Sequence, residues 1–132
     1  MTRINVGIHP KELPDKLLLA EHREITRIPN AVKSGRAKVV NIPDKFTLGK
    51  GHVKFFYDKL LYLKHRYAEL YLECIERGFN VQPKISSFDN VQSEYMRDYN
   101  ESLADRQIVL DRIRSKGFLL KSKEVQHELG KT

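Results

Sequence analysis

Three basic residues and one carboxylate near the N-terminus are the first side chains in this sequence that could do chemistry together. Lys16, Arg23 and Arg27 are spaced by seven and four residues, so on one helix they would share a stripe suited to binding phosphate groups. Glu24 lies at the edge of this stripe, where basic neighbours would stabilise its carboxylate. On spacing alone, a solvated charged face with local ion pairs explains the same pattern, so the chemistry needs a second indication.

The overall charge points to an anionic partner. The 132 residues include 24 Lys and Arg against 17 Asp and Glu, which gives a net charge of +7. Such a field favours nucleic acid, although a solvated basic surface of no particular purpose has the same composition. The single cysteine, Cys74, cannot form an internal disulfide, and no Cys/His spacing resembles a zinc site. We therefore expect no metal, no other cofactor and a reducing, cytoplasmic location.

Hydropathy and length limit the classes of protein further. No apolar run approaches the roughly 18 to 20 residues that a membrane span needs, and the N-terminus is polar by Arg3, so we expect neither a membrane nor a secretory role. A chain of this length with 40% hydrophobic residues can bury one modest core. We expect a single domain over residues 1–132, and a monomer.

The elements that would position the charged residues are helical. Pro14 marks the start of a first helix, which Pro29 should kink or end because proline lacks a backbone donor. From His52 to Arg77 the apolar residues alternate by threes and fours, and this pattern predicts one long core helix. Gly78 should terminate it.

A third helix and two long loops complete the predicted architecture. The helix begins at Asn100 or Ser102 and stops at Gly117. Residues 36–51 lack periodicity and form a basic loop, while residues 118–132 form a short helix or a frayed end. Because no stretch is a convincing strand, the sequence predicts an all-α, compact bundle of about three long helices with extended basic loops. Its core should contain Phe55, Phe56, Tyr62, Leu63 and Leu70.

Four ordered blocks of sequence give the second indication. They are residues 2–5, residues 20–24, residues 48–60 and residues 73–80. All four resemble the pyrimidine-dimer DNA glycosylase (phage endonuclease V) family, and together they cover the first 80 residues with one long gap in the loop. The match places buried aromatic residues and surface charges in one register, which makes it more specific than any short motif.

The resemblance implies a bifunctional enzyme of DNA base-excision repair, a glycosylase with abasic-site lyase activity that acts on pyrimidine dimers. In this chemistry the initiator methionine is removed and the freed amine of Thr2 attacks the anomeric carbon to form an imine. An α-amine suits the task because its ordinary pKa is about 8, so a useful fraction is neutral near pH 7. Glu24 matches the family's catalytic carboxylate, which would stabilise positive charge on the sugar and shuttle protons during elimination.

The partner that the resemblance implies is double-stranded DNA. Arg3, Arg23 and Arg27 match family arginines that hold the backbone and the flipped nucleotide. The remaining candidates are chosen only by charge and by their place in the first helix, the first loop or the third helix, where solubility is also a sufficient explanation. The predicted DNA-binding set is Arg3, Lys16, Arg23, Arg27, Lys50, Arg106 and Arg112.

Two departures from the family leave the substrate open. Leu17 stands where the family has a histidine, and residues 117–121 stand where the family has a Trp- and Tyr-rich cluster that helps engage the lesion. One alternative is therefore a glycosylase of the same fold that acts on another damaged or modified base. The other is a non-catalytic DNA-binding protein on this scaffold, for which a retained Met1 would be natural.

Overall fold

The computed structural model describes residues 2–121, and within this range the chain is helical without any strand, which confirms the all-α prediction. Lys59 and Met96 form an isolated antiparallel bridge. The helices are α1 (Asp15–Glu24), α2 (Arg27–Lys33), α3 (His52–Phe55), α4 (Leu60–Glu76) and α5 (Leu103–Ser115), with short 3-10 turns at Pro10–Glu12, Ile85–Phe88 and Ser93–Tyr95. No helix within residues 2–121 is long and apolar enough to cross a membrane.

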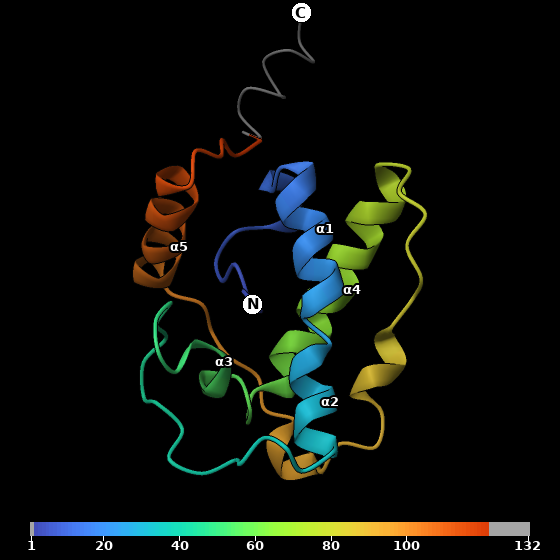
Figure 1. Cartoon of the computed structure of the whole chain (residues 1–132), viewed down its shortest axis with the longest axis vertical. Helices are drawn as coiled ribbons and strands as arrows, with labels where there is room; N and C mark the ends of the chain where they lie inside the picture. The colour runs from blue at the N-terminus through green and yellow to red at the C-terminus, as the bar shows by residue number, and fades with distance from the viewer. Residues whose placement is uncertain (1, 122–132) are drawn as a thin grey trace, which may run out of the picture.

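The N-terminal segment, residues 2–9, runs between α1 and α5 (Figure 1). Its alternate residues Ile4, Val6 and Ile8 are fully buried, so this extended segment forms part of the core rather than a free arm. Helices α1 and α2 lie along α4, and α5 lies on the other side of the N-terminal segment (Figure 1). The five aromatic and aliphatic residues predicted for the core are all buried.

The first predicted helix is divided into two. Helix α1 ends at Glu24 and α2 begins at Arg27, so the break comes before Pro29 rather than at it. Pro29 is the third residue of α2, in the first turn, where a missing backbone donor costs little because that donor has no partner within the helix. The prediction that Arg27 continues the stripe of Lys16 and Arg23 on one helix is therefore wrong.

The second predicted helix is also interrupted. Helix α3 ends at Phe55, and a turn through Lys59 precedes α4. At the break the Phe56 amide donates to the Val53 carbonyl and the Lys59 amide donates to the Phe56 carbonyl. These bonds span three residues instead of four, so they form tight turns that end the regular helix while Phe55 and Phe56 stay buried. Gly78, with φ of +84°, follows α4 as predicted.

Helix α5 begins and ends at the predicted signals. The Ser102 hydroxyl accepts a hydrogen bond from the Asp105 amide, and the Asp105 carboxylate accepts one from the Ser102 amide, which together form a capping box. Gly117, with φ of +81°, follows the last turn. Residues 118–121 are not helical, and the rest of the tail lies outside the described residues.

Candidate active site

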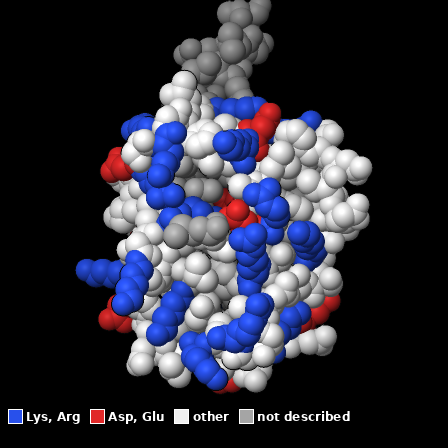
Figure 2. Space-filling model, in the orientation of Figure 1, with Lys and Arg blue, Asp and Glu red and all other residues white. Residues whose placement is uncertain are grey.

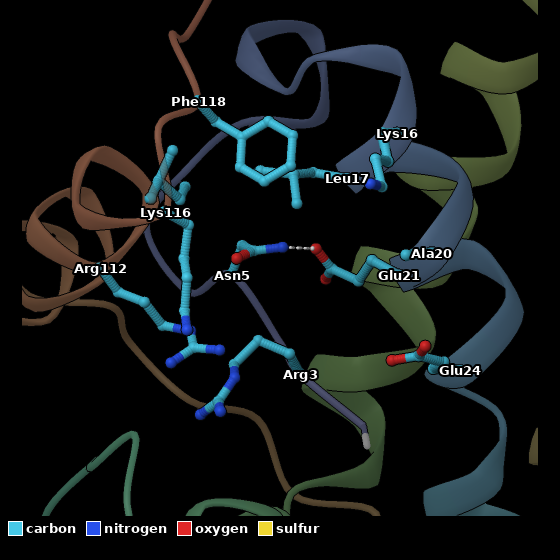
Figure 3. Close-up of a pocket in the computed structure, with 11 residues that line it drawn as sticks. Arg3, Asn5, Lys16, Leu17, Ala20, Glu21, Glu24, Arg112, Lys116 and Phe118 are labelled. Atoms are coloured by element: carbon cyan, nitrogen blue, oxygen red, sulfur yellow. Dashed lines mark hydrogen bonds between the residues drawn. The ribbon is translucent and has the colours of Figure 1, made fainter.

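A cavity of about 400 Å³ opens between α1 and α5, above the N-terminal segment (Figure 3). One side, the α1 wall, consists of Lys16, Leu17, Ala20, Glu21 and Glu24. The other side, the α5 wall, consists of Arg112, Ile113, Lys116 and Phe118. Arg3 and Asn5 of the N-terminal segment form the floor between the two walls.

Helical spacing explains the α1 wall. Lys16, Ala20 and Glu24 follow one another at intervals of four and therefore share a face of α1. Leu18 and Ile25 face the core instead and are fully buried. As a result Glu24, whose side chain is 13% exposed, points into the cavity (Figure 3).

The reversal of the chain after α5 completes the α5 wall. The Gly117 amide donates to the Arg114 carbonyl and the Phe118 amide donates to the Ile113 carbonyl, the paired bonds of a Schellman motif. This motif turns Phe118 back along the helix toward α1. The ammonium group of Lys16 lies 5.9 Å from the centre of the Phe118 ring, so the two walls meet at this end of the cavity.

The floor is joined to α1 by a buried polar contact. The Asn5 side-chain amide donates to Oε1 of Glu21 at 2.7 Å. Behind Glu21, the guanidinium of Arg66 on α4 donates to both carboxylate oxygens. Burial alone would lower the pKa of Arg66, but the facing Glu21 carboxylate outweighs this effect and raises it.

Cations dominate the electrostatics of the cavity. Glu21 is neutralised by Arg66, which leaves Glu24 as the only other acidic residue among the lining residues, against Arg3, Lys16, Arg112 and Lys116. Burial lowers the pKa of Arg3, the nearby Arg112 lowers it further, and Glu24 opposes both. On the face of the molecule in Figure 2, basic side chains are widespread and acidic side chains are few. Such a cavity is suited to an anionic substrate.

Thr2 lies beside this cavity rather than in it. It lines an adjoining cavity of about 500 Å³ formed mainly by residues 41–57, and Arg3 lines both cavities. The Arg3 guanidinium donates to the Leu48 carbonyl, which holds the N-terminal segment against that loop. Met1 lies outside the described residues.

The structure brings together only some of the predicted site residues. Arg3, Lys16, Glu24 and Arg112 line the same cavity. Arg23 is 61% exposed and lies 3.4 Å from Glu24, as the predicted basic neighbour of that carboxylate. Lys50 lines the adjoining cavity and Arg27 is exposed at the start of α2.

The predicted DNA-binding residue Arg106 makes its hydrogen bonds outside the cavity. Its guanidinium donates to the Gly7 carbonyl and to both carboxylate oxygens of Glu12, so it ties α5 to the N-terminal region. It does not line the cavity. This arrangement accounts for Arg106 without any contact to DNA.

Five residues in or directly behind the cavity received no site role from the sequence: Asn5, Glu21, Arg66, Lys116 and Phe118. A signal existed for two of them, because Glu21 and Arg66 occupy positions on the buried faces of α1 and α4. A charged residue at such a position requires a buried partner of opposite charge. Nothing in the sequence indicated that these two were partners, since they are 45 positions apart.

The cavity unites a carboxylate, several cations and the N-terminal segment on an all-α scaffold. Within residues 2–121 no group of three or more His, Cys, Asp or Glu residues could hold a metal ion. The sequence model of the pyrimidine dimer DNA glycosylase family matches residues 1–87, which confirms the resemblance, and the chain belongs to this family. It is thus related to DNA-repair enzymes whose substrate is DNA. The α5 wall lies beyond the matched range.

Proposed function

We propose that this protein excises pyrimidine dimers from double-stranded DNA and cleaves the resulting abasic site, with the α-amine of Thr2 as nucleophile after removal of Met1. The observation that carries the proposal is the convergence of Glu24 and the N-terminal segment on one cation-rich cavity in a member of this family. Family membership supports the glycosylase activity in general. The shared cavity supports the roles of Glu24 and Arg3, and the role of Thr2 rests on the resemblance and on its place in the adjoining cavity.

The proposed reaction has two stages. The neutral amine attacks C1′ of the damaged nucleotide while the bond from C1′ to the base breaks, and the base leaves with a proton from solvent or protein. The bound amine then loses a proton, and the bond from C1′ to the ring oxygen breaks as that oxygen takes up a proton, which leaves a ring-opened iminium. A base then removes a proton from C2′, and the 3′ carbon–oxygen bond breaks to release the phosphate.

Glu24 has two tasks in this scheme. Its carboxylate stabilises the positive charge that develops on the sugar and on the iminium, and it accepts the proton from C2′. The amine of Thr2 is a suitable nucleophile because an ordinary α-amine has a pKa of about 8. Arg3, Lys16 and Arg112 bind phosphates beside the flipped nucleotide, and Arg23, Arg27 and Lys50 extend this contact along the backbone.

A second candidate is the same chemistry on another damaged or modified base. Two observations support this second substrate class. Phe118 and the aliphatic Leu17 shape the end of the cavity, and the range that the family model matches stops before α5. The scaffold and the reacting groups would be unchanged, and only the base in the cavity would differ.

The test is to trap the imine with borohydride on duplex DNA that carries either a cyclobutane pyrimidine dimer or an abasic site. We expect an adduct on both substrates, which peptide mapping places on Thr2, and at least a hundredfold slower strand cleavage in Glu24→Gln. Glu76→Gln, an exposed carboxylate on α4, is the matched control and should react at the wild-type rate.

The outcomes separate the candidates. An adduct on the abasic site alone would favour the second candidate, and a panel of modified bases would then identify the substrate. No adduct on either DNA, from protein whose N-terminal residue is Thr2 by mass, would overturn both proposals and leave a DNA-binding protein.

A further inference from the structure

A buried ion pair lies directly beneath the cavity. Glu21 is 1% exposed and Arg66 is 4% exposed, and the guanidinium of Arg66 donates to both oxygens of the carboxylate. The remaining donor group of Arg66 bonds to the Ile8 carbonyl at 3.0 Å. One arginine at the centre of α4 therefore contacts both α1 and the N-terminal segment.

Asn5 extends this pair to the floor of the cavity. Its side chain is buried and donates to Glu21, so the carboxylate receives hydrogen bonds from α4 and from the N-terminal segment at the same time. Figure 3 shows the Asn5 amide directed at Glu21 across the base of the cavity. Asn5 and Glu21 both line the cavity, so this network reaches the site and is not confined to the core.

A second contact fixes the segment from the opposite side. The Ile4 amide donates to Nε2 of His52 at 2.9 Å, and Nδ1 of His52 lies 2.8 Å from the Thr47 carbonyl. Because the carbonyl can only accept, Nδ1 carries the proton and Nε2 is left as the acceptor. The backbone at Ile4 and the side chain at Asn5 are thus held by two different elements.

We propose that Asn5 and Glu21 are positioning residues that set the place of the Thr2 amine relative to the Glu24 carboxylate. Glu21 and Glu24 are one helical turn apart on α1, so the residue that anchors the N-terminal segment and the residue that acts on the sugar belong to one rigid element. Asn5 is three positions from Thr2. The inference rests on the proposed function and deepens it.

Stability alone is a weak explanation for this network. Removing a carboxylate and a guanidinium from water is costly, and well-packed apolar residues in place of a buried ion pair are often as stable or more so. What an apolar cluster lacks is the fixed direction of hydrogen bonds, which places a reacting group to within a fraction of an ångström. Hydrogen bonds of fixed direction near the proposed Thr2 nucleophile would hold its amine in a defined position.

The test uses Asn5→Leu, which matches the size of asparagine and leaves the pair of Glu21 and Arg66 in place. We expect the single-turnover rate of imine trapping at saturating abasic DNA to fall at least tenfold, while the Kd for the same DNA changes less than twofold. Hydrogen exchange at the Ile4 amide should accelerate at least tenfold. Asn80→Leu, at an exposed position, is the control and should change none of the three.

The possible failures are distinguishable. A wild-type trapping rate in folded Asn5→Leu would overturn the positioning role and leave the proposed function intact. Absence of any adduct from the wild-type protein would overturn the proposed function and this inference together. If Asn5→Leu fails to fold, Asn5→Ser is measured in its place, because its shorter side chain cannot span the distance to Glu21.

Discussion

The two walls of the cavity are attached to the molecule in different ways. The α1 wall is anchored by the pair of Glu21 and Arg66, and it lies within the range that the family model matches. The α5 wall lies beyond that range, and α5 is tied to the N-terminal region through Arg106 and a close approach at Gly7. Under the proposed function, we therefore expect the α1 wall to hold the reacting groups in place and the α5 wall to contact the base.

Breaking the anchor of the α1 wall should have the largest effect. Arg66→Met leaves the Glu21 carboxylate buried without its main partner, and we expect the free energy of unfolding to fall by about 3 to 5 kcal/mol in urea denaturation. The double variant Glu21→Met/Arg66→Met should recover most of this stability but not the rate of imine trapping, because two methionines cannot hold Asn5. Recovery of both properties would contradict the role given to the α1 wall.

Acid should weaken the same region through His52. Burial lowers the pKa of His52 to about 4, although its hydrogen bond to Thr47 opposes the shift, and Arg3 and Arg112 lower the pKa further while Glu21 raises it. The unfolded chain, with an ordinary histidine pKa near 6.5, takes up a proton first as the pH falls. The stability is therefore fully present above about pH 6.5 and is lost between pH 6.5 and 4.

The size of this loss is on the order of 3 kcal/mol. It should be visible as a slope in the free energy of unfolding against pH, and the slope should be much reduced in His52→Gln, which cannot titrate. His65→Gln, at an exposed position on α4, is the control. Equal slopes in the wild type and His52→Gln would show that other groups cause the acid sensitivity.

The junction between the two walls can be tested at Gly7. A Cβ there would lie 2.8 Å from Cβ of Arg106 and 2.9 Å from its Cα, so alanine would push α5 away from the N-terminal segment. Gly35 has the same φ of +81° but nothing within 4 Å of its Cβ position, so Gly35→Ala measures the backbone strain alone. We expect Gly7→Ala to cost about 2 kcal/mol more than Gly35→Ala in denaturant unfolding. Equal costs would mean that α5 adapts freely.

The smallest expected effect concerns the α5 wall itself. If the Phe118 ring stacks on the base, Phe118→Ala should slow excision from dimer-containing DNA about tenfold, a stacking contribution of about 1.4 kcal/mol. Cleavage of abasic DNA, which has no base to stack, should stay within twofold. Leu119→Ala, at an 84% exposed position, is the matched control. Equal losses on both substrates would remove the distinction between the walls.

Local sequence determined the helical character of the chain and several of the helix ends. The Ser102 cap, the glycines at 78 and 117 and the spacing of buried residues on α4 depend on neighbours within a few positions, and these predictions are confirmed. Glu24 was chosen for its basic neighbours and for its match to the family's catalytic carboxylate, and the structure then placed it on the side of α1 that faces the cavity. The breaks at residues 25–26 and 56–59 were missed because apolar spacing continues across a short turn.

Only the tertiary structure decided which side chains meet. Glu21 and Arg66 are 45 positions apart, and Arg106 is 94 positions from Glu12, so no local pattern indicates that either pair forms. The same holds for the cavity, because Phe118 reaches α1 only after the Schellman turn and the docking of α5. Periodicity reports which face of a helix is buried, whereas the identity of the partner on that face depends on how the helices pack.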